Sequence, residues 1–367
     1  MLKRIGATIV QGLVVMLGSC LATDWREASA QQPQASVPAI TDQHPVADPE
    51  NQLTPLPDGL PEGMLGEAGF QDDALPADCG LGCPPSWYYQ ADAVYMANES
   101  NGPVSLSDNM VLPEFSYDWG LRLTFGRKRD CLDGWEVSYT GLFEWSVEGE
   151  AAGALLSSKF VVPAADVNVS AFNDAAFHRQ TYESTLHNAE LNRRWWDWDT
   201  MSCLIGLRYV NIDEEFNFYS RDPLPAPDEG LFTVETTNRL VGPQCGVDFL
   251  QTLGPGGYLQ LNFRSKLGAY ANFAEGDVRL VNAGIQELNN DDTEVQFAAL
   301  WELGFLGRLQ LTRHLSVRGG YEAWYVYGVA LAEGQTVFPL SVNTGTSLTS
   351  DNDTWYHGAT VGIDVVW

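Results

Sequence analysis

The sequence predicts an all-β fold: an antiparallel up-and-down transmembrane β-barrel of about ten strands, preceded by a disordered segment rich in Pro and acidic residues. Three observations support this fold. Apolar and polar residues alternate with a period of two along ten segments after residue 86. The connections between these segments alternate between long and short, which is typical of outer-membrane barrels. The chain also ends on an alternating segment whose last residue is aromatic.

The composition excludes other classes of protein. The chain has 367 residues, with 20 Lys and Arg against 48 Asp and Glu, so it offers no basic face for nucleic acid. Its 45% hydrophobic residues are too many for a wholly disordered chain. No run of about 18 apolar residues follows the N-terminal region, so no membrane helix is predicted in the mature chain. Nothing in the sequence indicates a cofactor.

Residues 1–30 are predicted to be a cleaved secretory signal peptide. Lys3 and Arg4 precede an apolar stretch at 5–22, and small residues at 28–30 (Ala-Ser-Ala) form the exit site. An alternative remains open, in which residues 17–20 (Leu-Gly-Ser-Cys) form a lipidation box and Cys20 carries a lipid anchor.

Residues 31–86 are predicted to be a disordered, periplasmic linker. The segment contains 10 of the 19 prolines and nine acidic residues, with no Lys or Arg. Because proline removes hydrogen-bond donors and like charges repel, it should stay extended and solvated, as a spacer or a partner-binding tail. Cys79 and Cys83 are close enough in sequence to form a small disulfide in the oxidising periplasm.

Residues 87–367 are predicted to form the barrel. In the segment 115–127, for example, Phe115, Tyr117 and Trp119 alternate with Ser116 and Asp118. Ten strands are expected, at 87–97, 115–127, 135–147, 181–196, 200–218, 232–252, 257–273, 293–311, 315–330 and 354–367.

The predicted connections alternate in length. Long connections at 98–114, 148–180, 219–231, 274–292 and 331–353 separate short ones at 128–134, 197–199, 253–256 and 312–314. In outer-membrane barrels the tight turns face the periplasm and the long loops face outward. An even number of strands then places both ends of the barrel on the periplasmic side.

The polar faces of these strands carry eight acidic residues, with Asp92 among them, and eight basic residues. This equality suggests ion pairing inside the barrel. We therefore expect a lumen-lining set that either filters solutes or plugs the barrel: Asp118, Arg122, Glu136, Glu144, Glu190, Arg194, Arg208, Arg239, Arg264, Lys266, Glu302, Arg308, Arg318, Glu322 and Asp364.

Aromatic residues gather near the predicted strand ends, as in the girdles at membrane interfaces. Those expected at the tight-turn end are Phe125, Trp135, Trp195 and Tyr258, and those expected at the other end are Trp145, Tyr182, Phe216, Phe232, Tyr327 and Trp355.

The final residues are typical of the C-terminal strand by which barrel-assembly machinery recognises outer-membrane proteins. Val361, Ile363, Val365 and Trp367 alternate with polar or small residues. The predicted location is therefore the bacterial outer membrane, with membrane lipid and the assembly machinery as partners. The sequence does not predict an oligomeric state.

Three motifs carry a resemblance to a known family. They are Trp87-Tyr88-Tyr89-Gln90-Ala91-Asp92 after a Cys-containing leader at 79–85, residues 186–192 (Leu-His-Asn-Ala-Glu-Leu-Asn) and residues 206–209 (Gly-Leu-Arg-Tyr). Over residues 85–367 the chain resembles the beta-barrel porin-7 family of planctomycete-type outer-membrane proteins. The resemblance implies a pore, and it assigns no catalytic or ligand-binding residue.

No enzyme and no metal site are expected. The five histidines are scattered without metal-ligand spacing, and neither a Gly-x-Ser-x-Gly elbow nor a phosphate loop is present. The remote enzymatic alternative is a site at the outer rim, for which the candidates are Asp291, Asp292, Asp351, Asp353 and His357.

Two functions remain open from the sequence. The first is a porin-like passive diffusion channel for small solutes, and the second is a closed structural or surface-display barrel whose lumen is plugged by charge. Ten strands lie near the size at which side chains fill the interior. If residues 155–172 added two strands, a barrel of twelve would leave room for a narrow pore. Bulky ion pairs at one height would indicate a plug.

Overall fold

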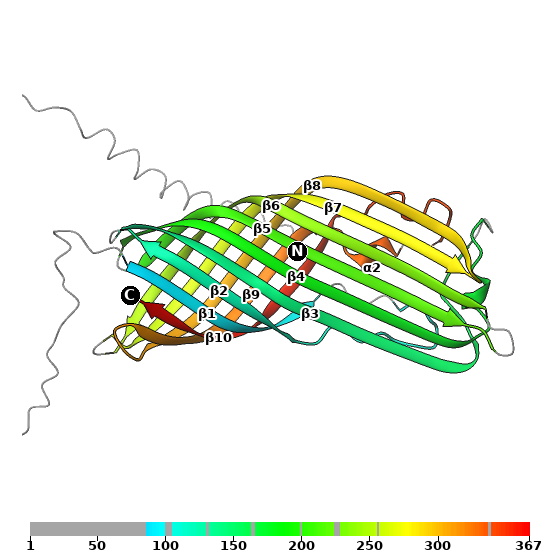
Figure 1. The fold of residues 1–367 in the computed structure, drawn as a ribbon, viewed down its shortest axis with the longest axis horizontal. Coiled ribbons are helices and arrows are strands. Elements are labelled where there is room, and N and C mark those ends of the chain that lie inside the picture. The colour runs from blue at the N-terminus through cyan, green and yellow to red at the C-terminus, as the bar shows by residue number, and fades with distance from the viewer. Residues whose placement is uncertain are drawn as a thin grey trace, which may run out of the picture. The chain divides into compact units, whose positions relative to one another are not determined.

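The computed structural model describes residues 86–99, 105–129, 132–162, 166–198, 200–223, 228–254, 257–336 and 339–367. In this part of the chain ten antiparallel strands form one closed, hydrogen-bonded ring, in which each strand pairs with its neighbours in sequence and β1 pairs with β10 (Figure 1). The predicted signal peptide, the linker and the Cys79–Cys83 disulfide lie outside the described residues.

All ten predicted strands are present. They are β1 (Ser86–Glu99), β2 (Asp118–Lys128), β3 (Asp133–Leu156), β4 (Ala175–Trp198), β5 (Met201–Arg221), β6 (Glu229–Leu253), β7 (Leu259–Asn282), β8 (Ile285–Gln310), β9 (Leu315–Val329) and β10 (Asn352–Val366).

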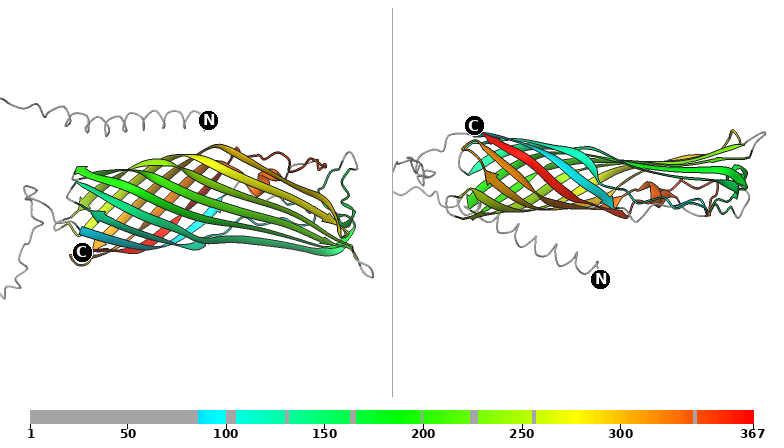
Figure 2. Two further views of the ribbon diagram at one scale, coloured as in Figure 1. Left: turned by 45° about the horizontal axis from the view of Figure 1, so that its top comes forward. Right: turned by 90° about the horizontal axis from the view of Figure 1, so that it is seen from below.

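The strands fall into two groups by length. β1, β2, β9 and β10 have 11 to 15 residues and lie side by side in the ring, whereas β3 to β8 have 21 to 26. The barrel is therefore closed only at the end that carries the short connections after β2, β4, β6 and β8, which we call the tight-turn end. Beyond it, β3 to β8 continue as an open curved sheet, which we call the extension (Figures 1 and 2).

The extension has two edges. β3 pairs with β2 only up to Gly141, and β8 pairs with β9 only from Ala299 onward. The remaining residues of β3 and β8 on those sides have no strand partner among the described residues, apart from a bridge between Ser107 and Ser158 just beyond the end of β3.

The predicted long loop at 274–292 is wrong. β7 and β8 pair through this region and are joined by a two-residue turn at Ala283 and Gly284, both with positive φ. Such turns match the twist of antiparallel strands. Polar outward residues made the segment resemble a loop, but the inward positions Val278, Leu280 and Leu288 are buried and apolar.

Residues 155–172 do not add two strands to the ring, so the twelve-stranded alternative is wrong for the described chain. They contain the end of β3 and a short 3₁₀ helix, η1 (Ser170–Phe172). A single helical turn, α2 (Ala332–Gln335), lies in the connection between β9 and β10. No described helix is long and apolar enough to cross a membrane.

A bulge in β3 reverses its two faces. The register with β4 shifts between Thr140 and Phe143, and Leu142 has a positive φ of 69°. Before the bulge Trp135 and Val137 are exposed; after it Phe143 and Trp145 are buried inside. One inserted residue in a strand moves every later side chain to the opposite face.

The C-terminal residues close the ring. β1 and β10 pair over twelve residues, and Trp87 and Trp367 exchange two backbone hydrogen bonds of 2.9 and 3.0 Å. Of the residues predicted to form the insertion signal, Val361, Ile363 and Trp367 are exposed on the outer face and Val365 is half-buried.

Candidate functional site

The inner face of the barrel is sorted into three layers. On β4, moving away from the tight turns, Arg194 and Glu190 are followed by Leu186 and then Tyr182. Most long strands repeat this order, because their buried residues change from charged to apolar at corresponding positions. We call these the charged layer, the first apolar layer and the second apolar layer.

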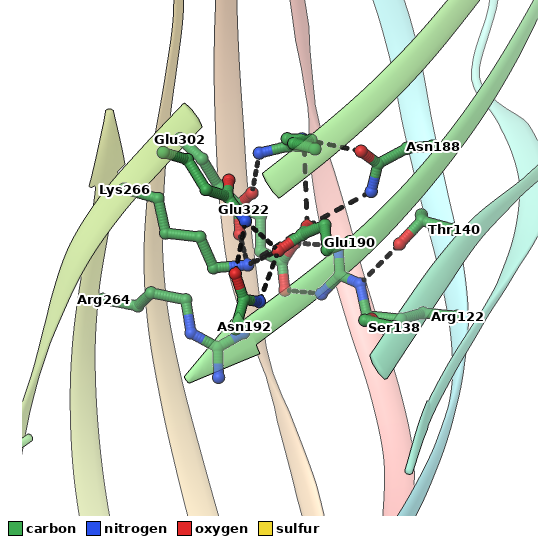
Figure 3. A network of polar contacts seen from close by, with 12 residues as sticks. Arg122, Ser138, Thr140, Asn188, Glu190, Asn192, Arg264, Lys266, Glu302 and Glu322 are labelled. Carbon is green, nitrogen blue, oxygen red and sulfur yellow. Dashed lines mark hydrogen bonds and ion pairs between the residues drawn. The ribbon is translucent and has the colours of Figure 1, made fainter. Parts of the chain in front are cut away.

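The centre of the charged layer is a four-residue ion-pair network (Figure 3). Arg208 lies 2.9 Å from Glu302, and Lys266 lies 2.9 Å from Glu190 and 3.3 Å from Glu302. Glu190 also accepts hydrogen bonds from Asn188, Asn192 and Gln244. These donors compensate for the desolvation of the buried carboxylate.

Arg122 and Glu322 form a two-pronged pair beside this network. The two terminal guanidinium nitrogens of Arg122 each lie 2.5 Å from a carboxylate oxygen of Glu322, and Arg122 Nε donates a hydrogen bond to Thr140. The side chains are 5% and 2% exposed, so water screens this pair very little.

The tight-turn end of the layer is built on two shared carboxylates. Asp248 binds both Arg194 and Arg264, and Glu136 binds Arg194 at 3.3 Å while it accepts a hydrogen bond from Tyr88.

Arg318 is held in the same way between two carboxylates. It contacts Asp92 and lies 3.3 Å from Asp364, which is also 3.0 Å from Arg308. Each carboxylate in the charged layer thus has a cationic partner.

All but three of the predicted lumen residues point into the barrel and belong to this layer. They are Arg122, Glu136, Glu190, Arg194, Arg208, Arg264, Lys266, Glu302, Arg308, Arg318, Glu322 and Asp364.

The other three predicted residues lie elsewhere. Glu144 is exposed on the outer face, because the bulge at Leu142 reverses the faces of β3. Arg239 also faces outward and pairs with exposed Glu275 at 2.7 Å. Asp118, the first residue of β2 at the end away from the tight turns, accepts a 2.7 Å hydrogen bond from the backbone N–H of Glu144.

The prediction missed Asp248, Asn188, Asn192 and Gln244. Asn188 and Asn192 share the inward positions of β4 with Glu190 and Arg194. Gln244 and Asp248 lie on β6, where the one residue that was predicted, Arg239, faces outward. The alternation that assigned Glu190 and Arg194 inward therefore contained the signal for Asn188 and Asn192.

The first apolar layer lies directly on the charged one. Trp324 is fully buried, and its ring centre lies 4.7 Å from the guanidinium carbon of Arg208 and 5.9 Å from that of Arg122. The rest of this layer crosses the interior as one cluster: Val94, Met96, Phe143, Trp145, Leu186, Val210, Ile212, Leu240, Tyr270, Ala298, Leu300, Val326, Val329, Leu331 and Tyr356.

The second apolar layer lies within the extension, and loops cover it. Leu106, Phe160, Phe172 and Leu340 come from three inter-strand connections and pack against strand residues such as Phe218. Amide side chains hold these loops: Asn238 exchanges two 2.7 Å hydrogen bonds with the backbone of Ala330, and Asn282 accepts one from Ala171.

Replacement of Asn238 by Ala is expected to release the connection between β9 and β10. Both backbone groups of Ala330 are buried, and an unsatisfied buried group costs about 1–3 kcal/mol. Hydrogen exchange at 330–336 should therefore accelerate about tenfold or more. Asn217→Ala, outside on β5, is the control and should leave exchange at 330–336 unchanged; equal acceleration in both variants would contradict this role.

Glu214 also holds this connection. It accepts hydrogen bonds from the Tyr182 hydroxyl at 2.7 Å and from the Ala332 backbone at 2.9 Å. Burial raises the pKa of the Glu214 carboxyl, and these hydrogen bonds offset only part of that effect.

The raised pKa predicts a pH dependence. The folded state favours the protonated carboxyl of Glu214. The resulting contribution to folding stability is complete below the unfolded pKa of about 4.3, and it is lost as the pH rises through the pKa of the folded state. Relative to Glu214→Gln, the wild type should lose stability between acidic and alkaline pH. The free energy of urea unfolding of both proteins, measured across this pH range, tests this loss. Parallel plots of that free energy against pH would refute it.

The rim residues considered for catalysis are dispersed. His357 contacts Glu99 at 2.9 Å and Tyr321 at 2.5 Å on the outer face, whereas Asp292 accepts a hydrogen bond from the Leu348 backbone inside. Asp291 is exposed on the outer face of β8. Among the described residues, no three His, Cys, Asp or Glu side chains are placed to hold a metal ion.

The outer face has an apolar belt at the level of the charged layer. Its exposed side chains include Trp119, Phe125, Trp135, Val137, Leu191, Ile205, Leu207, Tyr209, Val241, Phe249, Phe263, Phe305, Leu309, Tyr321, Val361 and Ile363.

The predicted aromatic girdles are partly correct. Phe125, Trp135, Tyr258, Tyr327 and Trp355 are exposed, and Trp195 is half-buried. The prediction is wrong for the remaining four, which are buried in the apolar layers because the inner face of the long strands is apolar there: Trp145, Tyr182, Phe216 and Phe232.

Beyond the belt, the outer face of the extension is acidic. Glu183, Glu215, Glu235, Asp277 and Asp291 lie directly opposite one another in register from β4 to β8. Arg279 contacts Asp277 at 2.7 Å and Glu235 at 3.7 Å. The like charges at the other positions repel each other, so this face is more stable in water.

No protein-family model matches the chain, and no curated protein matches it. Solved structures similar to it include the outer membrane protease OmpT from Escherichia coli, at 7% identity and a TM-score of 0.38, with 78% of this chain and 98% of that chain covered. A Pseudomonas aeruginosa FadL homologue matches at 9% identity and a TM-score of 0.29, covering 77% and 90%. An anion-selective porin from Comamonas acidovorans matches at 8% identity and 0.21, covering 77% and 99%.

Proposed function

We propose that this chain is a bacterial outer-membrane β-barrel with a closed lumen, which anchors the extension at the cell surface. The apolar belt supports the membrane location, because so large an exposed apolar surface is stable against lipid and unfavourable in water. The acidic outer face of the extension supports its position in water. The tight turns then face the periplasm, with the preceding linker on the same side.

The lengths of the strands agree with this arrangement. The 26 residues of β8 span about 85 Å along the strand, or about 60 Å along the barrel axis at a tilt of about 45°. An outer-membrane belt is about 25 Å tall. More than half of β8 would therefore lie beyond the membrane.

The single observation that carries the closed lumen is the stacking of the charged layer under the first apolar layer. Oppositely charged side chains meet across the interior at one height, and fully buried Trp324 covers them. This packing favours the surface-display alternative over the diffusion channel. Partners in this proposal are membrane lipid and, during biogenesis, barrel-assembly machinery.

The proposal includes no catalytic step. Asp291, Asp292 and His357 face different surroundings and are already engaged in separate contacts or exposed to solvent. A rim enzyme would need an acid or base close to a second reacting group.

Planar-bilayer recording of the purified full chain tests the closed lumen. We expect no stable conductance steps from protein that is shown to be folded in the same bilayers. Reproducible steps whose ion selectivity changes with Lys266→Glu would overturn the proposal and establish the channel.

Gel mobility tests the membrane barrel itself. The unheated protein in detergent should migrate differently from the boiled chain, because closed barrels resist unfolding by detergent alone. Identical mobility together with extraction from membranes by salt alone would refute it.

A further inference from the structure

A cavity of about 250 Å³ opens below the charged layer, at the tight-turn end of the barrel. We call it the basal cavity. Its walls carry more positive than negative charge: the cations are Lys128, Arg194, Arg264, Arg308 and Arg318, and the carboxylates are Glu136, Asp248 and Asp364.

The arginines of the basal cavity are matched by carboxylates. Glu136, Asp248 and Asp364 contact them from the walls, and Asp92 binds Arg318 from behind. Four arginines therefore meet four carboxylates.

Lys128 is the cation that remains. Its ammonium lies 4.7 Å from the ring centre of Trp196, and no carboxylate of the described residues lies within ion-pair distance of it. Arg308 and Arg194, which line the same cavity, are also positive. An ammonium among cations and an aromatic ring is most stable when an anion joins it.

The cavity wall also contains polar side chains without charge. Ser202 and Asn262 line the same cavity with further polar groups.

We propose that the basal cavity binds one phosphate group, through the ammonium of Lys128 and the polar side chains of Ser202 and Asn262 beside it. Phosphate offers several strong acceptor oxygens to donors that come from different strands, and both Lys and Arg bind it readily. The group belongs either to soluble phosphate or to a phospholipid headgroup. The site is independent of lumen closure, which conductance reports separately.

Calorimetric titration of the full chain in a maltoside detergent, which contains no phosphate, tests this site. Inorganic phosphate and a short-chain phosphatidylglycerol are the two probes. We expect one site per chain and an affinity at least about tenfold weaker in Lys128→Gln, since hydrogen bonds to charged groups contribute about that much. The control, Arg279→Gln, removes an exposed outer-face arginine and should bind like the wild type.

The two probes separate the two sources. Lys128-dependent binding of inorganic phosphate assigns the site to soluble phosphate, and Lys128-dependent binding of the phospholipid alone assigns it to a headgroup. Absence of binding by both probes overturns the proposal. Equal affinity in wild type, Lys128→Gln and Arg308→Gln, each shown to be folded by gel mobility, overturns it as well.

Discussion

Replacement of Arg122 by Met is expected to destabilise the barrel by about 3–5 kcal/mol, because Glu322 would keep its charge in the interior without its two-pronged partner. The free energy of unfolding by urea in lipid vesicles measures this loss. The double variant Arg122→Met/Glu322→Leu removes both charges and should recover most of the stability, since apolar replacements of a buried ion pair are often neutral or stabilising.

An exposed pair provides the matched control. Arg239 and Glu275 are separated by 2.7 Å, with side chains 46% and 48% exposed. Arg239→Met should change the unfolding free energy by less than about 1 kcal/mol, because solvent screens such pairs. Equal losses in Arg122→Met and Arg239→Met, or a double variant no more stable than Arg122→Met, would show that the charged layer is not a desolvated network.

Replacement of Trp324 by Ala is expected to cost about 3–5 kcal/mol, because it leaves a large cavity between the charged layer and the rest of the first apolar layer. Its ring also covers the guanidinium groups of Arg208 and Arg122, so their contacts with the aromatic face are lost. Urea unfolding measures the loss.

The conservative variant isolates the packing contribution. Trp324→Phe keeps an aromatic ring in the layer and should retain more than half of the stability that Trp324→Ala loses. Both variants should show no conductance steps in planar bilayers, since the ion pairs of the charged layer remain. A stability loss below about 1 kcal/mol in Trp324→Ala would contradict a close-packed layer.

Alternation along single strands was enough to predict the ten strands, because each strand buries one face. It failed where the backbone departs from a regular strand. β3 has a bulge at Leu142, which has a positive φ, and no residue type in β3 indicates it. Glu144 was therefore assigned to the wrong face. Residues 274–292 were predicted to be a loop, although they belong to β7 and β8, because a strand exposed to water carries polar residues outward, as a loop does.

The composition of the charged layer was largely predictable, whereas its pairing was not. Arg122 and Glu322 are 200 residues apart, and they meet only because ring closure brings β2 and β9 to either side of β1 and β10. The excess of Lys128 over the carboxylates likewise depends on which strand ends surround the basal cavity. Sequence gives the charges on each strand, but register between strands decides their partners.

The two edges of the extension have a consequence for self-association. A bare sheet edge is a template on which another chain can add a strand, and such growth leads to fibres. On the β8 edge the carboxylates of Asp291 and Glu294 are exposed, and on the β3 edge Glu148 and Glu150 are exposed beside Arg179. A second copy that approached in line would bring identical charges together. The extension can therefore remain an open sheet without polymerising, and neutralising Asp291 and Glu294 would make it prone to do so.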